Sequence, residues 1–114
     1  MNQELEEYRA YEYWLASMQG ISDLKKRKLR EYMKCAKDIY YIEETQLKKV
    51  DFLSEEEKNI LQKAQKSKSF EEEWERIKEQ KIWMHLYFEN EYPEKLKMLT
   101  DCPYAIYGKG KLPK

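Results

Sequence analysis

The stretch that decides the fold runs from Trp14 to Met33 and reads WLASMQGISDLKKRKLREYM. It opens on the end of a helical pattern, in which Leu15 and Met18 share an apolar face. Gly20 interrupts this pattern, because glycine tolerates the backbone angles at which helices end. Ser22 is suited to cap a following helix by accepting a backbone N–H. The stretch therefore predicts two helices joined by a tight turn.

The second of these helices has an apolar side and a basic side. Leu29 and Tyr32 are spaced to face back toward the first helix, with Ile21 of the turn between the two helices. The cations are expected to project to the opposite side, and they are Lys26, Arg27, Arg30, Lys34 and Lys37. A helix, a turn of glycine, apolar and small residues, and a basic helix together are typical of a helix-hairpin-helix.

Such a hairpin often binds nucleic-acid phosphates through its turn amides and helix N-termini. We therefore predict DNA contacts from the turn and the basic stripe, at Gly20, Ser22, Lys26, Arg27, Arg30 and Lys34. A solvated helix face would produce the same stripe, so this alternative stays open. On the DNA interpretation, Arg27→Glu together with Arg30→Glu is expected to abolish binding without unfolding the domain, because both side chains should point away from Leu29.

Composition favours a folded, mainly helical chain. Of the 114 residues 39% are charged and only three are Gly and three Pro, which suits helices with solvated outer faces. The formal net charge is zero, so a basic site must be a local patch. No apolar run is long enough for a membrane span, and the acidic start MNQELEEY is no signal peptide. The two cysteines, Cys35 and Cys102, fit no metal or redox spacing and suit a reducing cytoplasm.

Helical patterns continue through the first part of the chain. We expect helices over residues 2–18, 36–40 and 43–50, and a further helix that starts at the capping box from Ser54 to Glu57. Residues 66–68, Lys-Ser-Lys, are the best linker, and a second capping box is expected from Ser69 to Glu72. Residues 1–66 are thus predicted to form one helical domain. Its core should contain Trp14, Leu15, Ile21, Leu29, Tyr32, Leu47, Leu53 and Leu61.

The pattern changes after Lys81. Apolar residues alternate from Ile82 to Phe88, which predicts a strand, and a second short strand is expected from Tyr104 to Tyr107. Pro93 suits the first turn of a helix between them. We therefore expect residues 67–114 to hold a linking helix and the first β-α-β elements of a truncated Rossmann-like domain. Open strand edges seek partners, so a homodimer through the exposed strands is expected.

Catalytic chemistry is not indicated. The single histidine, His85, lies in a strand pattern with no Cys or Asp at a spacing that would form a triad. Gly108 and Gly110 lack the third glycine and the following helix of a phosphate-binding loop. No enzyme activity, cofactor or metal is therefore expected.

Three stretches resemble the N-terminal part of the bacterial DNA-processing protein A family (DprA, also called Smf). They are Tyr13-Trp14-Leu15-Ala16 through Gly20-Ile21, Tyr92-Pro93-Glu94-Lys95-Leu96, and the segment from Pro103 through Tyr107-Gly108-Lys109-Gly110 to Lys111-Leu112-Pro113. Their order and spacing agree with the family over essentially the whole chain.

The resemblance implies a helix-hairpin-helix or sterile-alpha-motif (SAM)-like domain followed by an extended Rossmann-like domain. Family members bind single-stranded DNA, load RecA recombinase onto it and serve natural transformation. Many of them form dimers, and they are not known as catalysts.

The chain also departs from the family. It stops at Lys114, about where the Rossmann-like core and the family's main DNA pocket should begin. Ser22 and Lys26 replace the second glycine and the small apolar residue that are common in hairpins, and Lys34-Cys35 replaces a Gly-small pair. Two hypotheses follow: a fragment of a DNA-processing protein that itself binds single-stranded DNA weakly, or a helical protein-interaction or spacer module with no DNA binding of its own.

Overall fold

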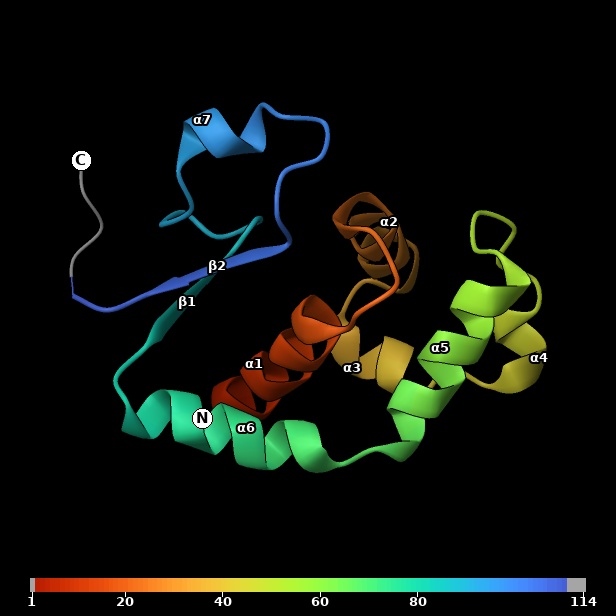
Figure 1. Ribbon diagram of the computed structural model, residues 1–114, viewed down its shortest axis with the longest axis horizontal. Coiled ribbons are helices and arrows are strands. Elements are labelled where there is room, and N and C mark those ends of the chain that lie inside the picture. The colour runs from red at the N-terminus through yellow and green to blue at the C-terminus, as the bar shows by residue number, and fades with distance from the viewer. Residues whose placement is uncertain (1, 111–114) are drawn as a thin grey trace.

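The computed structural model describes residues 2–110, and over this range the chain folds mainly into helices, with one small sheet of two strands (Figure 1). The motif residues Lys111, Leu112 and Pro113 lie outside the described residues. The helices are α1 (Asn2–Ser17), α2 (Asp23–Met33), α3 (Ala36–Tyr40), α4 (Glu44–Leu47), α5 (Glu55–Lys66), α6 (Ser69–Glu79) and α7 (Glu94–Lys97). The strands are β1 (Trp83–Leu86) and β2 (Ala105–Gly108).

Helix α1 lies at the centre of the packing and contacts α2, α3 and α6 (Figure 1). The predicted core residues are all buried except Tyr32, which is 54% exposed. The prediction that Tyr32 belongs to the core is therefore wrong. Three residues along a helix correspond to a rotation of about 300°, so the Tyr32 side chain lies at the edge of the helix face that buries Leu29. Its ring instead packs edge-on against Phe52, with 6.5 Å between ring centroids.

The turn between α1 and α2 has the predicted local structure. Gly20 adopts a φ of +93°, and a Cβ at this position would lie 2.6 Å from Cδ1 of Ile60. Ser22 caps α2, since its hydroxyl accepts a hydrogen bond from the Lys25 N–H at 3.2 Å. Ile21 is buried between the helices. Both backbone conformation and close packing therefore require glycine at the turn.

The two predicted capping boxes have different outcomes. The first is confirmed: Ser54 and Glu57 exchange hydrogen bonds of 2.8 and 3.1 Å at the start of α5. The second is wrong, because α6 already includes Ser69 and its N-cap, Lys68, makes no side-chain cap bond. The hydroxyl of Ser67 instead accepts from the Ser69 N–H at 3.5 Å.

The two strands form an antiparallel pair, in which Trp83 lies opposite Gly108 and Leu86 opposite Ala105. The strands of a β-α-β crossover are parallel, so these strands are not the first such unit of a Rossmann-like sheet. Met84 and Leu86 are buried on the face toward the helices. On the other face Trp83 stacks on His85, with centroids 4.5 Å apart.

The buried core continues across the predicted linker at residues 66–68. Phe70 and Trp74 of α6 and Met84 and Leu86 of β1 belong to the same cluster of buried side chains as Trp14 of α1. The described residues on both sides of residue 66 therefore share one core. The division into two domains at that residue stays a prediction.

Candidate functional site

The residues predicted to contact DNA are separated by the structure. Gly20, Ser22 and Lys26 line a groove beside the hairpin turn. Arg27 and Arg30 turn toward the segment that carries the strands. Lys34 lies apart from both, as the exposed C-cap of α2. The basic stripe is therefore not one continuous surface.

Lys26 is buried, with only 4% of its surface exposed, and its Nζ donates to the Ala16 carbonyl at 2.8 Å. The expectation that it points away from the core is wrong, because residues three apart share a helix face and Lys26 precedes Leu29 by three. Its ammonium satisfies a carbonyl in the last turn of α1. Burial lowers the pKa of Lys26, and the nearby Asp23 carboxylate partly offsets this effect.

Arg27 also has an intramolecular partner. Its Nη2 donates to the Thr100 carbonyl, in the loop after α7, and its guanidinium lies 5.8 Å from the centroid of the Tyr87 ring. This guanidinium therefore joins α2 to the C-terminal segment and does not project freely into solvent.

Arg30 binds a carboxylate of α1. Its Nε lies 3.1 and 3.2 Å from the Glu12 carboxylate oxygens, and its guanidinium carbon lies 3.6 Å from the Phe88 ring centroid. Burial lowers the pKa of Arg30, but the Glu12 carboxylate outweighs this effect and the net pKa is raised. Reversing the charges of Arg27 and Arg30 would place acids against these acceptors, so we expect the double variant to lose stability, in contrast to the expectation from the sequence.

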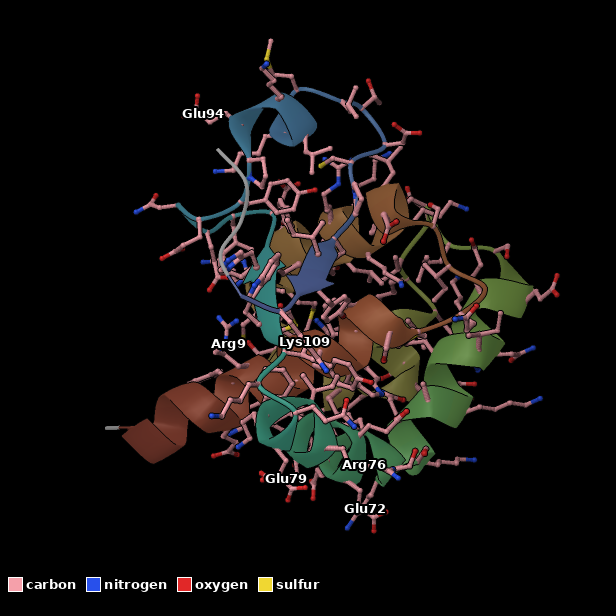
Figure 2. The ribbon with its side chains drawn as sticks, turned by 60° about the vertical axis from the view of Figure 1, so that its left-hand side comes forward. Arg9, Glu72, Arg76, Glu79, Glu94 and Lys109 are labelled. Carbon is pink, nitrogen blue, oxygen red and sulfur yellow. The ribbon has the colours of Figure 1, made fainter. Side chains whose placement is uncertain are left out.

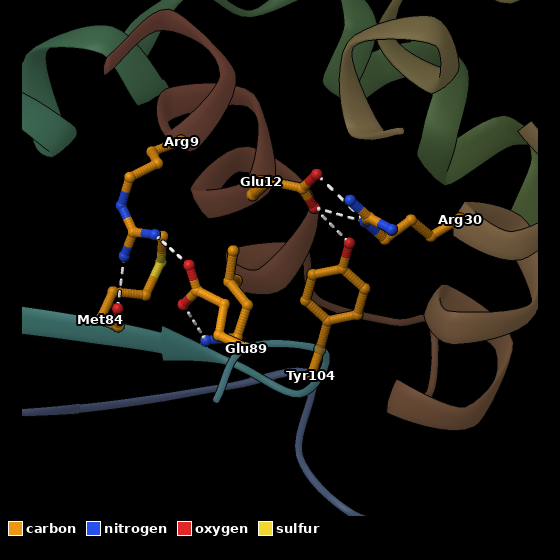
Figure 3. A network of polar contacts seen from close by, with 7 residues as sticks. Arg9, Glu12, Arg30, Met84, Glu89 and Tyr104 are labelled. Carbon is orange, nitrogen blue, oxygen red and sulfur yellow. Dashed lines mark hydrogen bonds and ion pairs between the residues drawn. The ribbon is translucent and has the colours of Figure 1, made fainter. Parts of the chain in front are cut away.

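Glu12 is the centre of a buried polar network (Figure 3). Only 4% of its surface is exposed, and it accepts hydrogen bonds from Arg30, from the Tyr104 hydroxyl and, at 3.5 Å, from the Ala36 N–H. Burial, then the Glu12 carboxylate, raises the pKa of Tyr104, so the hydroxyl stays a donor at neutral pH. The network joins α1, α2, α3 and the residue before β2.

Sequence reasoning missed Glu12. The available signal was its position, since Glu12 lies inside the aromatic run Tyr11 to Trp14 on a helix face otherwise suited to the core. A carboxylate in such a position needs buried donors, because burying an unpaired charge is costly.

A second polar link holds β1 against α1 (Figure 3). Arg9 pairs with Glu89 at 2.5 Å and also donates to the Met84 carbonyl. The other Glu89 oxygen accepts from the Leu86 N–H at 2.8 Å. The two side chains thus satisfy backbone groups on the outer edge of β1.

The described motif residues contact one another. Tyr92 is buried and its hydroxyl donates to the Pro103 carbonyl at 2.8 Å, joining the second motif to the third. Gly108 allows the Trp83 ring to approach, since a Cβ there would lie 2.4 Å from the indole. Trp83 Nε1 in turn donates to the Gly110 carbonyl at 2.5 Å.

The groove beside the turn has a volume of about 580 Å³. Its walls come from the end of α1, the turn and Lys26, from Ile77 and Ile82 near the end of α6, and from Tyr107 of β2. Within the described residues, the backbone N–H groups of residues 20–22 donate no hydrogen bond. Burial raises the pKa of Tyr107, and the nearby Tyr13 and Asp23 add to this effect.

Comparison of the chain with protein-family models, curated proteins and solved structures found no match. Among residues 2–110, no helix is long and apolar enough to cross a membrane. The same residues contain no cluster of three or more His, Cys, Asp or Glu side chains that could hold a metal ion.

Proposed function

We propose that the chain is the N-terminal region of a cytoplasmic DNA-processing protein of the family that it resembles. The whole protein would bind single-stranded DNA and assist RecA loading in natural transformation, by binding and not by catalysis. Within it, the described residues would serve as a rigid protein-interaction and spacer module. The main observation in support of this proposal is the hydrogen bond that the Tyr104 hydroxyl donates to the buried Glu12 carboxylate.

This bond supports the proposal because it joins a motif residue to the helical body. Tyr104 belongs to the third family-like stretch, and Tyr92 of the second stretch holds the carbonyl just before it. A buried acid and buried tyrosines fix geometry, since each must keep its partners to avoid an unsatisfied polar group. The motifs would thus hold whatever follows β2 in a defined position relative to α1.

The use of the α2 cations supports the same proposal. Lys26, Arg27 and Arg30 have acceptors within the protein, at Ala16, Thr100 and Glu12. Binding a phosphate would require the arginines to leave these acceptors. The module would therefore contribute little electrostatic affinity for DNA, which depends on cations that are free to neutralise phosphates.

We further propose that the helical part is of the helix-hairpin-helix or SAM-like type. Support comes from α1, the Gly20 turn and α2, packed against the shorter helices α3 to α5. On this proposal the antiparallel strand pair precedes the Rossmann-like sheet and forms no part of its parallel crossovers.

One observation favours the other function, direct contact with single-stranded DNA. Lys26 and residues 20–22, whose backbone N–H groups donate no hydrogen bond, line the same groove. Such groups can hold one phosphate. They offer few contacts, so this function predicts only weak and sequence-independent binding.

A titration of a labelled single-stranded oligonucleotide with the intact chain separates the two functions. At about 150 mM salt the interaction-module proposal predicts no saturation up to about 100 µM protein, the weak end of non-specific binding. It also predicts no change in the Lys34→Glu variant, whose side chain is exposed. The proposal is contradicted by saturation below about 100 µM that weakens steeply between about 50 and 200 mM salt.

A further inference from the structure

Helices α1 and α6 pack side by side (Figure 1), and together they line a groove of about 430 Å³, here called the α1–α6 groove. Helix α1 contributes Ala10 and Tyr11 to its floor, and α6 contributes Phe70 and Trp74. The three aromatic side chains are buried and Ala10 is half-buried. The floor of the α1–α6 groove is therefore apolar.

The rim of this groove is acidic. Residues three or four apart lie on one side of a helix, which places Glu7 of α1 and Glu71, Glu75 and Lys78 of α6 beside the floor. Lys78 lies 2.9 Å from the Glu75 carboxylate, and Lys37 of α3, outside the lining, lies 3.1 Å from that of Glu7. Among the described residues, Glu71 has no cationic partner. The rim therefore stays negative when both lysines are counted.

The two ion pairs do not close the groove to a further cation. The side chains of both pairs are each 32% or more exposed. Exposed ion pairs are weak and are screened by salt, so they exchange readily. A guanidinium is less strongly hydrated than an ammonium and binds a carboxylate through two parallel hydrogen bonds. Arginine is therefore the cation that this rim suits best.

The surface around the groove carries the same sign of charge. Helix α6 contains five glutamates, one arginine and one lysine, and Figure 2 shows Glu72, Arg76 and Glu79 on its outer side, away from the rest of the fold. Arg9 of α1 is held by Glu89 on the side of β1. Such a surface repels the phosphates of nucleic acids and anionic lipids and attracts basic protein segments. The partner that it suits is therefore a protein.

Trp74 provides an independent sign of an absent partner. It lines the groove, only 5% of its surface is exposed, and its indole Nε1 is buried. Within the part of the chain that the structure describes, this donor has no hydrogen-bond acceptor. Nearly all buried donors in folded proteins have one. A backbone carbonyl of an occupant would supply the acceptor that the chain itself does not.

We propose that the α1–α6 groove binds an arginine side chain from a basic segment of a partner protein. The aliphatic stem of this arginine packs on the apolar floor, as the stems of long cationic side chains do. Its guanidinium pairs with Glu71, and a carbonyl of the same segment accepts from Trp74. This inference rests on the proposed interaction-module function and names its surface and the chemistry of its partner.

The probe is the acetylated and amidated peptide Gly-Lys-Ala-Arg-Ala-Lys-Gly, added to the intact chain at about 50 mM salt so that charges are screened little. We expect saturable shifts of the indole Nε1–H resonance of Trp74 and of the amide resonances of Glu71 and Glu75. A matched peptide with citrulline, the neutral isostere of arginine, keeps both lysines and should bind at least about fivefold more weakly.

Two variants separate binding in the groove from general attraction to an acidic helix. Glu71→Gln should weaken binding by about threefold or more, because it removes the carboxylate that pairs with the guanidinium. Glu72→Gln makes the same change in charge one residue along, on the outer side of α6, and should alter the affinity by less than about twofold (Figure 2). Both residues are exposed, so both variants should fold.

Absence of a saturable shift up to about 1 mM peptide overturns the inference. So does equal binding of the citrulline peptide, or an equal loss of affinity in Glu71→Gln and Glu72→Gln, since attraction would then be general to the helix. Shifts of the same resonances by a single-stranded oligonucleotide overturn it as well and also contradict the interaction-module function. Failure of the peptide alone leaves that function standing.

Discussion

Replacing Glu12 with glutamine is expected to lower the free energy of unfolding by about 3 kcal/mol. Removing one member of a buried ion pair strands the other charge, which typically costs about 3–5 kcal/mol. The lower value is expected here because 20% of the Arg30 side chain is exposed. The substitution also weakens the acceptor of the Tyr104 hydroxyl, which is fully buried.

Glu7→Gln is the matched control. Glu7 lies on α1, as Glu12 does, and pairs with Lys37 of α3, but its side chain is exposed. This substitution should cost no more than about 1 kcal/mol, as exposed ion pairs do. Urea unfolding followed by circular dichroism measures both variants. Equal stability of Glu12→Gln and Glu7→Gln would show that the Glu12 network does not hold the fold.

Leu29→Ala is expected to lower the free energy of unfolding by about 2–5 kcal/mol. Leu29 is fully buried in the core, and its truncation removes apolar contacts and leaves a cavity. The cost should lie in the upper half of this range if α1 and α3 cannot move to fill the space.

Leu99→Ala provides the comparison for Leu29, because it makes the same chemical change at a residue that is 50% exposed. Its effect on the urea midpoint should correspond to about 0.5 kcal/mol or less. If Leu29→Ala were as mild as Leu99→Ala, the packing of α2 on α1 would be wrong.

Local signals in the sequence predicted the helical part well. The Gly20 turn, the Ser22 cap and the capping box at Ser54 each depend on backbone atoms within a few residues, and all three are present. The positions of β1 and β2 were also predictable, because alternation is a property of each strand alone.

Contacts between distant residues could not be predicted in the same way. The basic stripe on α2 looks like a solvated or DNA-binding face in sequence, yet Arg27 meets a carbonyl 73 residues away. Whether β1 and β2 pair in parallel or antiparallel depends on the path of the chain between them. Tyr32 shows a further difficulty, since a pattern identifies a helix face more reliably than the edge of that face.

The candidate site was predictable only in part. The turn residues Gly20 and Ser22 lie at the groove as expected, and Lys26 joins them there for a different reason, its burial against the end of α1. Tyr107 enters the site only through the tertiary fold.

The central claim is that the α2 arginines serve the fold, with Arg30 held by Glu12. A double-mutant cycle of urea unfolding with Glu12→Gln, Arg30→Met and the double variant tests this claim most directly. Because removing both charges leaves neither one unpaired, the double variant should be at least about 1.5 kcal/mol more stable than the sum of the single effects predicts. If the changes in the free energy of unfolding add to within about 0.5 kcal/mol, the claim is contradicted, and Arg30 would be available to contact DNA.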